Sequence, residues 1–145
     1  MNRFHVNITV TDVKKSVEFY SNLFGQSPSV SKPDYAKWML DDPAVNFAIG
    51  TACGDINLGI SHLGIQADSA TGLQRIADRL KAANQTTVDQ QAATCCYAVS
   101  DKTWVQDPNG VNWETFYTHD TATEYGEDEA RLELEAVLNT KKSCC

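Results

Sequence analysis

One pattern of apolar residues occurs twice in this sequence, 57 residues apart, and this internal repeat restricts the fold more than any other feature. An alternating, β-branched strand pattern over residues 4–10 is followed by a helix cap at 11–12 and an amphipathic helix pattern over 13–23. The same order returns as a strand pattern over 62–67 and a cap at 68–69, followed by an apolar stripe with helical spacing. The repeat therefore predicts two modules that each begin with a strand and a helix.

Three short strand-like segments follow each helix pattern. They cover residues 27–31, 35–40 and 46–50 in the first half, and 86–91, 103–107 and 112–118 in the second. The turn residues Asp107-Pro108-Asn109-Gly110 indicate a hairpin between the last two segments. Neither half alone would bury enough apolar surface to be stable. We therefore predict an α+β fold in which two tandem βαβββ modules, about 1–51 and about 61–120, pack as one domain over residues 1–120.

The remaining residues, 121–145, form an acidic C-terminal appendage. We predict a short charged helix around residues 127–138, followed by a loose end that carries the pair Cys144-Cys145. Terminal segments of this kind are commonly poorly ordered unless other contacts hold them.

Composition narrows the class of function. The net charge is −7 with 12 Lys and Arg among 145 residues, which argues against a nucleic-acid partner because phosphate binding needs a basic surface. No apolar run approaches the roughly 20 residues of a membrane helix, and the first residues do not resemble a signal peptide. Four of the five cysteines form adjacent pairs, and neighbouring cysteines cannot cross-link distant segments by bonding with each other. We therefore expect a reduced, cytoplasmic protein without a membrane partner.

Superposing the two repeats suggests a metal site. His5 falls on His62 in the first strand of each module, and Glu114 in the last strand falls on Ala48. Two imidazoles and one carboxylate with vacant coordination positions are typical of non-haem Fe(II) oxygenases, because O₂ and a substrate atom each need a place on the metal.

A lone histidine on a strand is more often a core or surface residue than a ligand. Here two of only three histidines superpose, and Glu114 interrupts the apolar strand Trp113-Glu114-Thr115-Phe116. Burial of an unpaired carboxylate costs several kcal/mol, so a metal partner explains this residue better than packing does. We predict that His5, His62 and Glu114 are metal ligands with a catalytic role.

The repeat and these ligand positions resemble the vicinal oxygen chelate superfamily, which includes glyoxalase I, bleomycin- and fosfomycin-resistance proteins and extradiol dioxygenases. The likeness covers about residues 1–120. It rests on Asn7-Ile8-Thr9-Val10-Thr11-Asp12, on Ser16-Val17-Glu18-Phe19-Tyr20, and on Asp107-Pro108-Asn109-Gly110 before Trp113-Glu114. The resemblance implies a curved, mixed sheet that forms a cup with flanking helices. It leaves the reaction open.

A second pair of adjacent thiols narrows the reaction. His62 and Glu114 are 52 residues apart, whereas His5 and Ala48 are 43 apart, so about nine residues are inserted in the second module. We predict that they form a loop near residues 90–102, which carries Cys95-Cys96. Vicinal thiols are soft ligands that do not suit a hard N/O iron site, and we place them on the substrate side. Two thiolates can hold a trivalent arsenic atom that carries one organic group.

The segment Thr94-Cys95-Cys96-Tyr97-Ala98, the segment Trp104-Val105-Gln106-Asp107-Pro108 and the cysteine-bearing tail resemble organoarsenical carbon–arsenic lyases and related cadmium-induced proteins. The resemblance implies cleavage of the carbon–arsenic bond of methylarsenite and trivalent aromatic arsenicals to arsenite, dependent on Fe(II) and O₂. It also implies that His5, His62 and Glu114 bind iron and that Cys95 and Cys96 bind arsenic.

Several alternatives stay open at this point. Tyr97 either contacts the substrate site or only packs, and Lys102 either lowers the pKa of the thiols or is a solvated lysine. Cys144 and Cys145 either receive arsenic or end a dispensable tail. Two other functions are a cadmium- or arsenite-binding protein without catalysis and a glyoxalase-like metal-dependent enzyme. Three further points stay open: which organic group the arsenic carries, and whether the metal is Fe, Mn or Co. The third is whether the chain is a monomer or a homodimer whose sites are shared between subunits.

Overall fold

The structure, a computed structural model, describes residues 1–51, 58–126, 134 and 136. These residues belong to two compact units, one from Arg3 to Leu63 and the other comprising Met1–Asn2 and the chain from Gly64 onward. The border between the units falls inside a strand, close to the predicted start of the second module near residue 61. None of the helices in the described ranges is long and apolar enough to cross a membrane.

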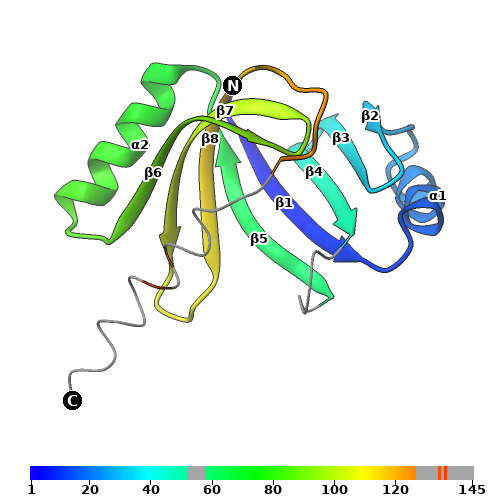
Figure 1. The fold of residues 1–145 in the computed structure, drawn as a ribbon, viewed down its shortest axis with the longest axis horizontal. Coiled ribbons are helices and arrows are strands. Elements are labelled where there is room, and N and C mark those ends of the chain that lie inside the picture. The colour runs from blue at the N-terminus through cyan, green and yellow to red at the C-terminus, as the bar shows by residue number, and fades with distance from the viewer. Residues whose placement is uncertain (52–57, 127–133, 135, 137–145) are drawn as a thin grey trace. The chain divides into compact units, whose positions relative to one another are not determined.

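The first unit follows the predicted order of elements, shown from blue to cyan in Figure 1. The elements are β1 (Arg3–Val10), α1 (Val13–Phe24), β2 (Val30–Ser31), β3 (Tyr35–Asp41) and β4 (Ala44–Thr51). Asp12 caps α1 by accepting a hydrogen bond from the backbone N–H of Lys15 at 3.0 Å, and Gly25 ends the helix in the left-handed conformation. The predicted helix and its cap are therefore confirmed.

The two faces of β1 differ in chemistry. Val6, Ile8 and Val10 pack against a core of buried residues that also receives α1. The buried members of this core are Val13, Ala36, Trp38, Phe47 and Ile49. On the opposite face, the alternating residues His5, Asn7 and Thr9 are polar and nevertheless buried. A polar face that is shielded from water needs hydrogen-bonding or charged partners, so it is the natural place to look for a site.

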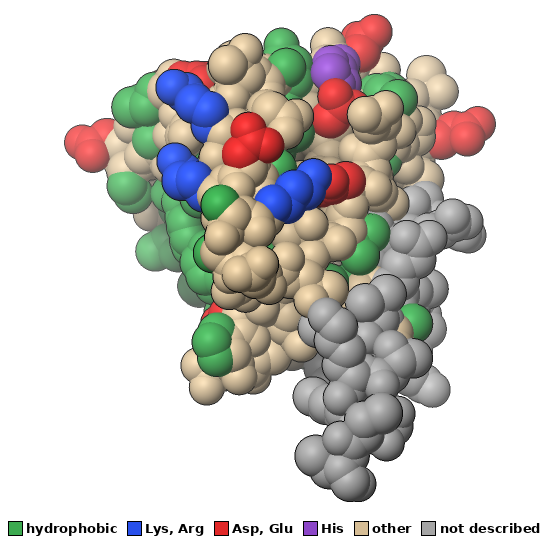
Figure 2. Space-filling view, turned by 90° about the vertical axis from the view of Figure 1, so that its left-hand side faces the viewer, with side chains coloured by type: hydrophobic (Ala, Val, Ile, Leu, Met, Phe, Trp, Pro, Cys, Tyr) green, Lys and Arg blue, Asp and Glu red, His purple; other side chains and the backbone are tan. Residues whose placement is uncertain are grey.

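The second unit repeats this order. It contains α2 (Ala70–Ala82), β6 (Thr87–Cys95), β7 (Ala98–Gln106) and β8 (Asn112–Thr121), preceded by β5 (Gly59–Gln66), which spans the border. The hydroxyl of Ser69 accepts from the backbone N–H of Gly72 at 3.0 Å and caps α2, whose predicted apolar stripe is largely buried. The exposed face of α2 is polar, and Figure 2 shows basic and acidic side chains next to one another on this side of the molecule.

The strand order confirms the tandem βαβββ organisation. The eight strands are hydrogen-bonded in the order β2-β3-β4-β1-β5-β8-β7-β6, in which the second four strands follow the order of the first four in reverse (Figure 1). The pairing of β1 with β4 is parallel, and the pairings of β3 with β4, of β6 with β7 and of β7 with β8 are antiparallel. The predicted hairpin at residues 107–110 joins β7 to β8, with Asp107 accepting from two backbone N–H groups.

One expectation about the second module is wrong. Residues 90–102 do not form an inserted loop, because β6 and β7 run through almost all of them and pair in register from Thr87–Val105 to Cys95–Ala98, with a bulge after Gln90. The additional residues lengthen a hairpin. Paired backbone groups satisfy the hydrogen bonds that a loop of this length would leave to water.

Most of the predicted appendage helix lies outside the described residues, as do Cys53, Cys144 and Cys145. Leu134 and Ala136, the described residues of that segment, are helical. Leu134 is completely buried against Trp104. At this residue the appendage is therefore part of the core of its unit.

Trp38 is completely buried at the centre of the first core, so its replacement by alanine should be costly. We expect Trp38→Ala to lower the free energy of unfolding by about 3–5 kcal/mol, because a large cavity remains. Urea titration measures this change. Phe19→Ala, which shortens an aromatic residue that is 62% exposed on α1, should change it by less than about 0.5 kcal/mol. Equal losses in both variants would contradict the assigned core.

Candidate metal centre and thiol turn

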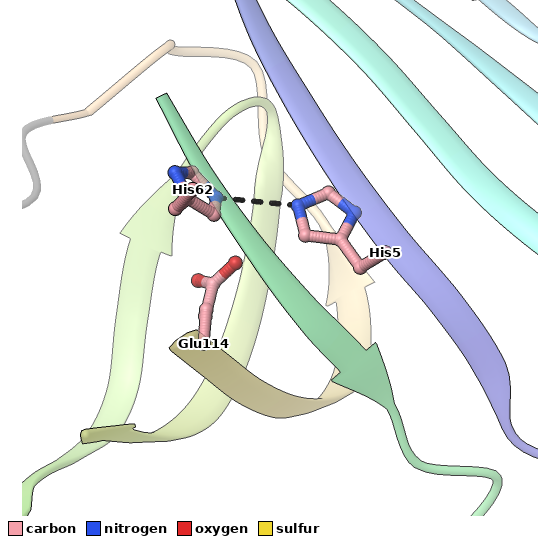
Figure 3. Close-up of side chains that lie close together, drawn as sticks. All are labelled: His5, His62 and Glu114. Atoms are coloured by element: carbon pink, nitrogen blue, oxygen red, sulfur yellow. Dashed lines mark hydrogen bonds between the residues drawn. The ribbon is translucent and has the colours of Figure 1, made fainter. Parts of the chain in front are cut away.

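Two buried histidines face each other. His5 lies on the polar face of β1 and His62 on β5, and they are 5% and 8% exposed. Their Nε2 atoms are 3.3 Å apart, as the dashed line in Figure 3 shows. The repeat therefore brings the predicted pair together.

The remaining ring nitrogens determine which atoms can bind a metal. Nδ1 of His5 lies 3.0 Å from the backbone carbonyl oxygen of Asn46, which can only accept, so Nδ1 carries the proton and Nε2 offers a lone pair. Nδ1 of His62 lies 3.2 Å from the hydroxyl of Ser61. When Nδ1 of His62 donates to that hydroxyl, both Nε2 atoms present lone pairs. Partners of this kind fix the tautomer of histidines that bind metals.

Glu114 lies on β8 and is 4% exposed. Its Oε1 is 2.6 Å from Nζ of Lys102, and both side chains are 6% exposed. The predicted equivalence of Glu114 with Ala48 agrees with the strand geometry. Asn7 pairs with Ala48 in the first unit, and a Cβ at Gly64, 57 residues after Asn7, would lie 2.0 Å from the carbonyl oxygen of Glu114. The buried carboxylate thus occupies the position that the first repeat fills with alanine.

The three predicted ligands form one group. Each of His5, His62 and Glu114 offers one ligand atom, and these atoms all lie within 4.8 Å of one another (Figure 3). Two neutral imidazole nitrogens and one carboxylate oxygen match the donor set of a two-histidine, one-carboxylate centre. The buried donors therefore fit Fe(II) or another divalent metal of similar preference.

Lys102 is not solvated, so one of its two sequence interpretations is wrong. It lies on β7, pairs with Glu114 and has its ammonium group 5.9 Å from the centre of the Trp104 ring. In sequence it is two residues before Trp104, and residues two apart on a strand point to the same face. That spacing was the available signal that Lys102 faces inward.

The thiols occupy a tight turn rather than an open loop. We call residues Cys95–Ala98 the thiol turn: Cys95 ends β6, Ala98 begins β7, and the two are a register pair. Cys96 and Tyr97 have φ of 57° and 61°, the left-handed values that a two-residue type I′ hairpin requires. Asparagine and glycine usually fill these positions, so Cys96-Tyr97 is an uncommon choice.

Both thiols are in position to act as a pair. The sulfur atoms of Cys95 and Cys96 are 3.0 Å apart, and Cys95 is 7% exposed. The hydrogen bond from Cys95 is the main cause that lowers the pKa of Cys96, and burial opposes it. The Lys102 ammonium also lowers this pKa, the Glu114 charge raises it, and a hydrogen bond from Tyr125 lowers it. The turn is therefore close enough to Lys102 and Glu114 to respond to their charges.

The structure also adds residues that the sequence did not single out. Asn46 and Ser61 fix the imidazole rings, and the ring of Tyr97 packs edge-on against Tyr125 at 5.8 Å between ring centres. The contact from Asn46 is made by its backbone carbonyl, which every residue type carries, so the sequence held no signal for it. Nothing in the local sequence indicated Tyr125.

Removal of the lysine partner should leave a buried carboxylate uncompensated. We expect Lys102→Met to lower the free energy of unfolding of the metal-free protein by about 3–5 kcal/mol, measured by urea titration. The matched control is Lys81→Met, which breaks the exposed ion pair with Asp89 and should change stability little. A small loss for Lys102→Met would mean that water or another cation already compensates Glu114.

Comparison with known proteins agrees with the fold and identifies relatives of this chain. The trivalent organoarsenical cleaving enzyme of Bacillus sp. (strain MD1) is 42% identical over 126 residues, which cover 86% of this chain and 78% of that protein. The probable trivalent organoarsenical cleaving enzyme of Bacillus subtilis (strain 168) is 34% identical over 146 residues and covers both chains completely.

A solved structure shares the fold at low identity. An extradiol ring-cleaving dioxygenase from B. fuscum superposes with a TM-score of 0.60 and 17% identity over 90% of this chain and 35% of its own. The Glyoxalase/Bleomycin resistance protein/Dioxygenase superfamily model matches residues 3–115. With the repeated strand order and the relatives above, this match shows that the chain belongs to the glyoxalase, bleomycin resistance protein and dioxygenase superfamily.

Proposed function

We propose that this protein cleaves the carbon–arsenic bond of trivalent organoarsenicals, with Fe(II) as cofactor and O₂ as co-substrate, and releases arsenite. The observation that carries the proposal is the presence of a buried His5–His62–Glu114 group and a preorganised dithiol in one chain. The names of the relatives at 42% and 34% identity support arsenical chemistry. The proposal takes residues 1–120 as one catalytic domain and places it in the cytoplasm.

The histidines and the glutamate would hold the metal. His5 and His62 would bind through Nε2, while Asn46 and Ser61 keep their rings oriented. Fe(II), when bound there, supplies activation of O₂ for oxidative cleavage. Lys102 compensates the charge of Glu114 when no cation does, which keeps the buried carboxylate in place.

The dithiol would capture the substrate. A trivalent arsenical with two hydroxyl groups reacts with the thiols of Cys95 and Cys96 so that two As–O bonds break, two As–S bonds form and two waters leave. No oxidation state changes in this step. A lowered pKa favours the thiolate of Cys96, and the thiolate is the nucleophile in this step. Two bonds to one arsenic atom restrict its organic group, which turns a bimolecular encounter into an oriented one.

The decisive experiment compares aerobic and anaerobic incubation of the iron-loaded protein with methylarsenite, followed by arsenic speciation. We expect arsenite only when O₂ is present. His62→Ala should lose iron and turnover together, whereas Cys95→Ser should keep iron and lose turnover. Equal product without O₂ would contradict the proposal. Stoichiometric capture of arsenic or cadmium without product would instead indicate a binding protein. Turnover of the methylglyoxal–glutathione adduct with nickel or zinc would indicate a glyoxalase-like enzyme.

Metal affinity gives a second test that does not depend on turnover. Ser61→Ala removes the partner of Nδ1 of His62, so we expect Fe(II) or Co(II) to bind about 10- to 100-fold more weakly, as measured by titration. Ser29→Ala is the matched control, because Ser29 donates to the carbonyl of Lys37 at an exposed position. If both variants bind metal as the parent does, His62 does not depend on Ser61 for metal binding.

A further inference from the structure

A short segment after β8 runs beside the thiol turn. We call residues 122–126 the strap. The backbone N–H of Ala122 donates to the carbonyl of Tyr97 at 2.9 Å, and the backbone N–H of Cys96 donates to the carbonyl of Tyr125 at 2.5 Å. Cys95 and Gly126 form an antiparallel bridge. Both left-handed residues of the turn are thus held by main-chain bonds from outside the hairpin.

The side chain of Tyr125 adds two contacts to this arrangement. Its ring meets the ring of Tyr97 edge-on, with centres 5.8 Å apart and an angle of 81° between planes. Its hydroxyl hydrogen-bonds to the sulfur of Cys96. A phenol that donates to a sulfur favours the thiolate form and fixes its direction.

Gly126 is required by close approach as well as by backbone conformation. Its φ is +70°, and a Cβ there would lie 1.9 Å from the carbonyl oxygen of Thr94 and 3.2 Å from the nitrogen of Cys95. These neighbours are backbone atoms, which cannot turn aside as a flexible side chain can. Any other residue at 126 therefore pushes the strap away from the turn.

The strap explains how an unfavourable turn is maintained. Side chains with a Cβ adopt the left-handed conformation at a cost, and Cys96 and Tyr97 do so consecutively. An isolated hairpin could relax such a turn by changing its register or twist. Because the strap bonds Cys96 and Tyr97 directly, relaxation would break those bonds.

We propose that the strap, through Tyr125 and Gly126, positions Cys95 and Cys96 for capture of a trivalent arsenical. The inference rests on the proposed function and deepens it. Tyr125 acts as a positioning residue, since it acts through Cys96. Residues 122–126 are thus part of the substrate-binding apparatus and not only the start of an appendage.

Phenylarsine oxide is a suitable probe, because it binds dithiols without requiring metal or O₂. The two thiols lose their protons to the arsenyl oxygen, two As–S bonds form, and one water leaves. The measurements use residues 1–145 with Cys144→Ser and Cys145→Ser, so that the tail thiols do not compete. Affinity is measured by calorimetry without metal, and folding by circular dichroism.

The matched pair is Gly126→Ala and Gly25→Ala. Gly25 has nearly the same φ, +68°, but nothing lies within 4 Å of a Cβ built on it, so this control carries the backbone strain without the clash. We expect Gly126→Ala to weaken phenylarsine oxide binding at least about tenfold, as misplacement of reacting groups commonly does, while Gly25→Ala binds as the parent does. Equal affinity in the two variants would overturn the positioning role of Gly126.

Tyr125→Phe keeps the ring and removes only the hydroxyl, and it decides the question if Gly126→Ala does not fold. Its readout is the pH profile of Cys96 alkylation by iodoacetamide, followed by mass spectrometry of the peptide that carries Cys96. Cys95, Lys102, Glu114 and Tyr125 act on this thiol, and only the last is altered. We expect the midpoint to move to higher pH, and an unchanged profile would overturn the role of the hydroxyl.

The outcomes separate the two proposals. If the parent binds phenylarsine oxide but forms no O₂-dependent product from methylarsenite, the proposed function fails. The strap inference is then decided only by the phenylarsine oxide affinity and the alkylation profile of the variants. If the variants bind as the parent does, the strap inference fails whatever the cleavage assay shows.

Discussion

Burial of polar side chains on one face of the central strands is the constraint on which the rest of the structure depends. On β1 the apolar face packs on the core under α1, while His5 and Asn7 are buried on the other face. Polar groups removed from water must find partners: His5 finds them in the carbonyl of Asn46 and in His62, and on β7 and β8 Lys102 and Glu114 pair with each other. Such a network holds its side chains in defined directions, which a metal site also requires.

Much of this arrangement could be predicted because it follows from local periodicity and from the repeat. Helix caps depend on a few adjacent residues, and doubling placed His5 with His62 and Glu114 with Ala48. The hairpin at residues 90–102 was missed because its turn lacks asparagine and glycine. Its conformation depends on a hydrogen bond to Tyr125, and a contact between residues so far apart in the sequence leaves no local pattern.

Hard and soft donors are separated in this chain. The nitrogen and oxygen donors lie on β1, β5 and β8, whereas the sulfur donors lie where β6 meets β7. This separation lets each set keep its own preference, nitrogen and oxygen for harder metal ions and sulfur for soft, thiophilic elements. Lys102 connects the two sets electrostatically, since its charge acts on both Glu114 and Cys96.

The left-handed residues at Cys96 and Tyr97 have a consequence for the evolution and engineering of this protein. Asn-Gly at these two positions would suit the turn better and make the hairpin easier to form. A library screened only for heat resistance would therefore enrich replacements that discard a sulfur atom. Screens for higher thermal stability should therefore keep Cys96 and Tyr97 unchanged and introduce substitutions at other positions.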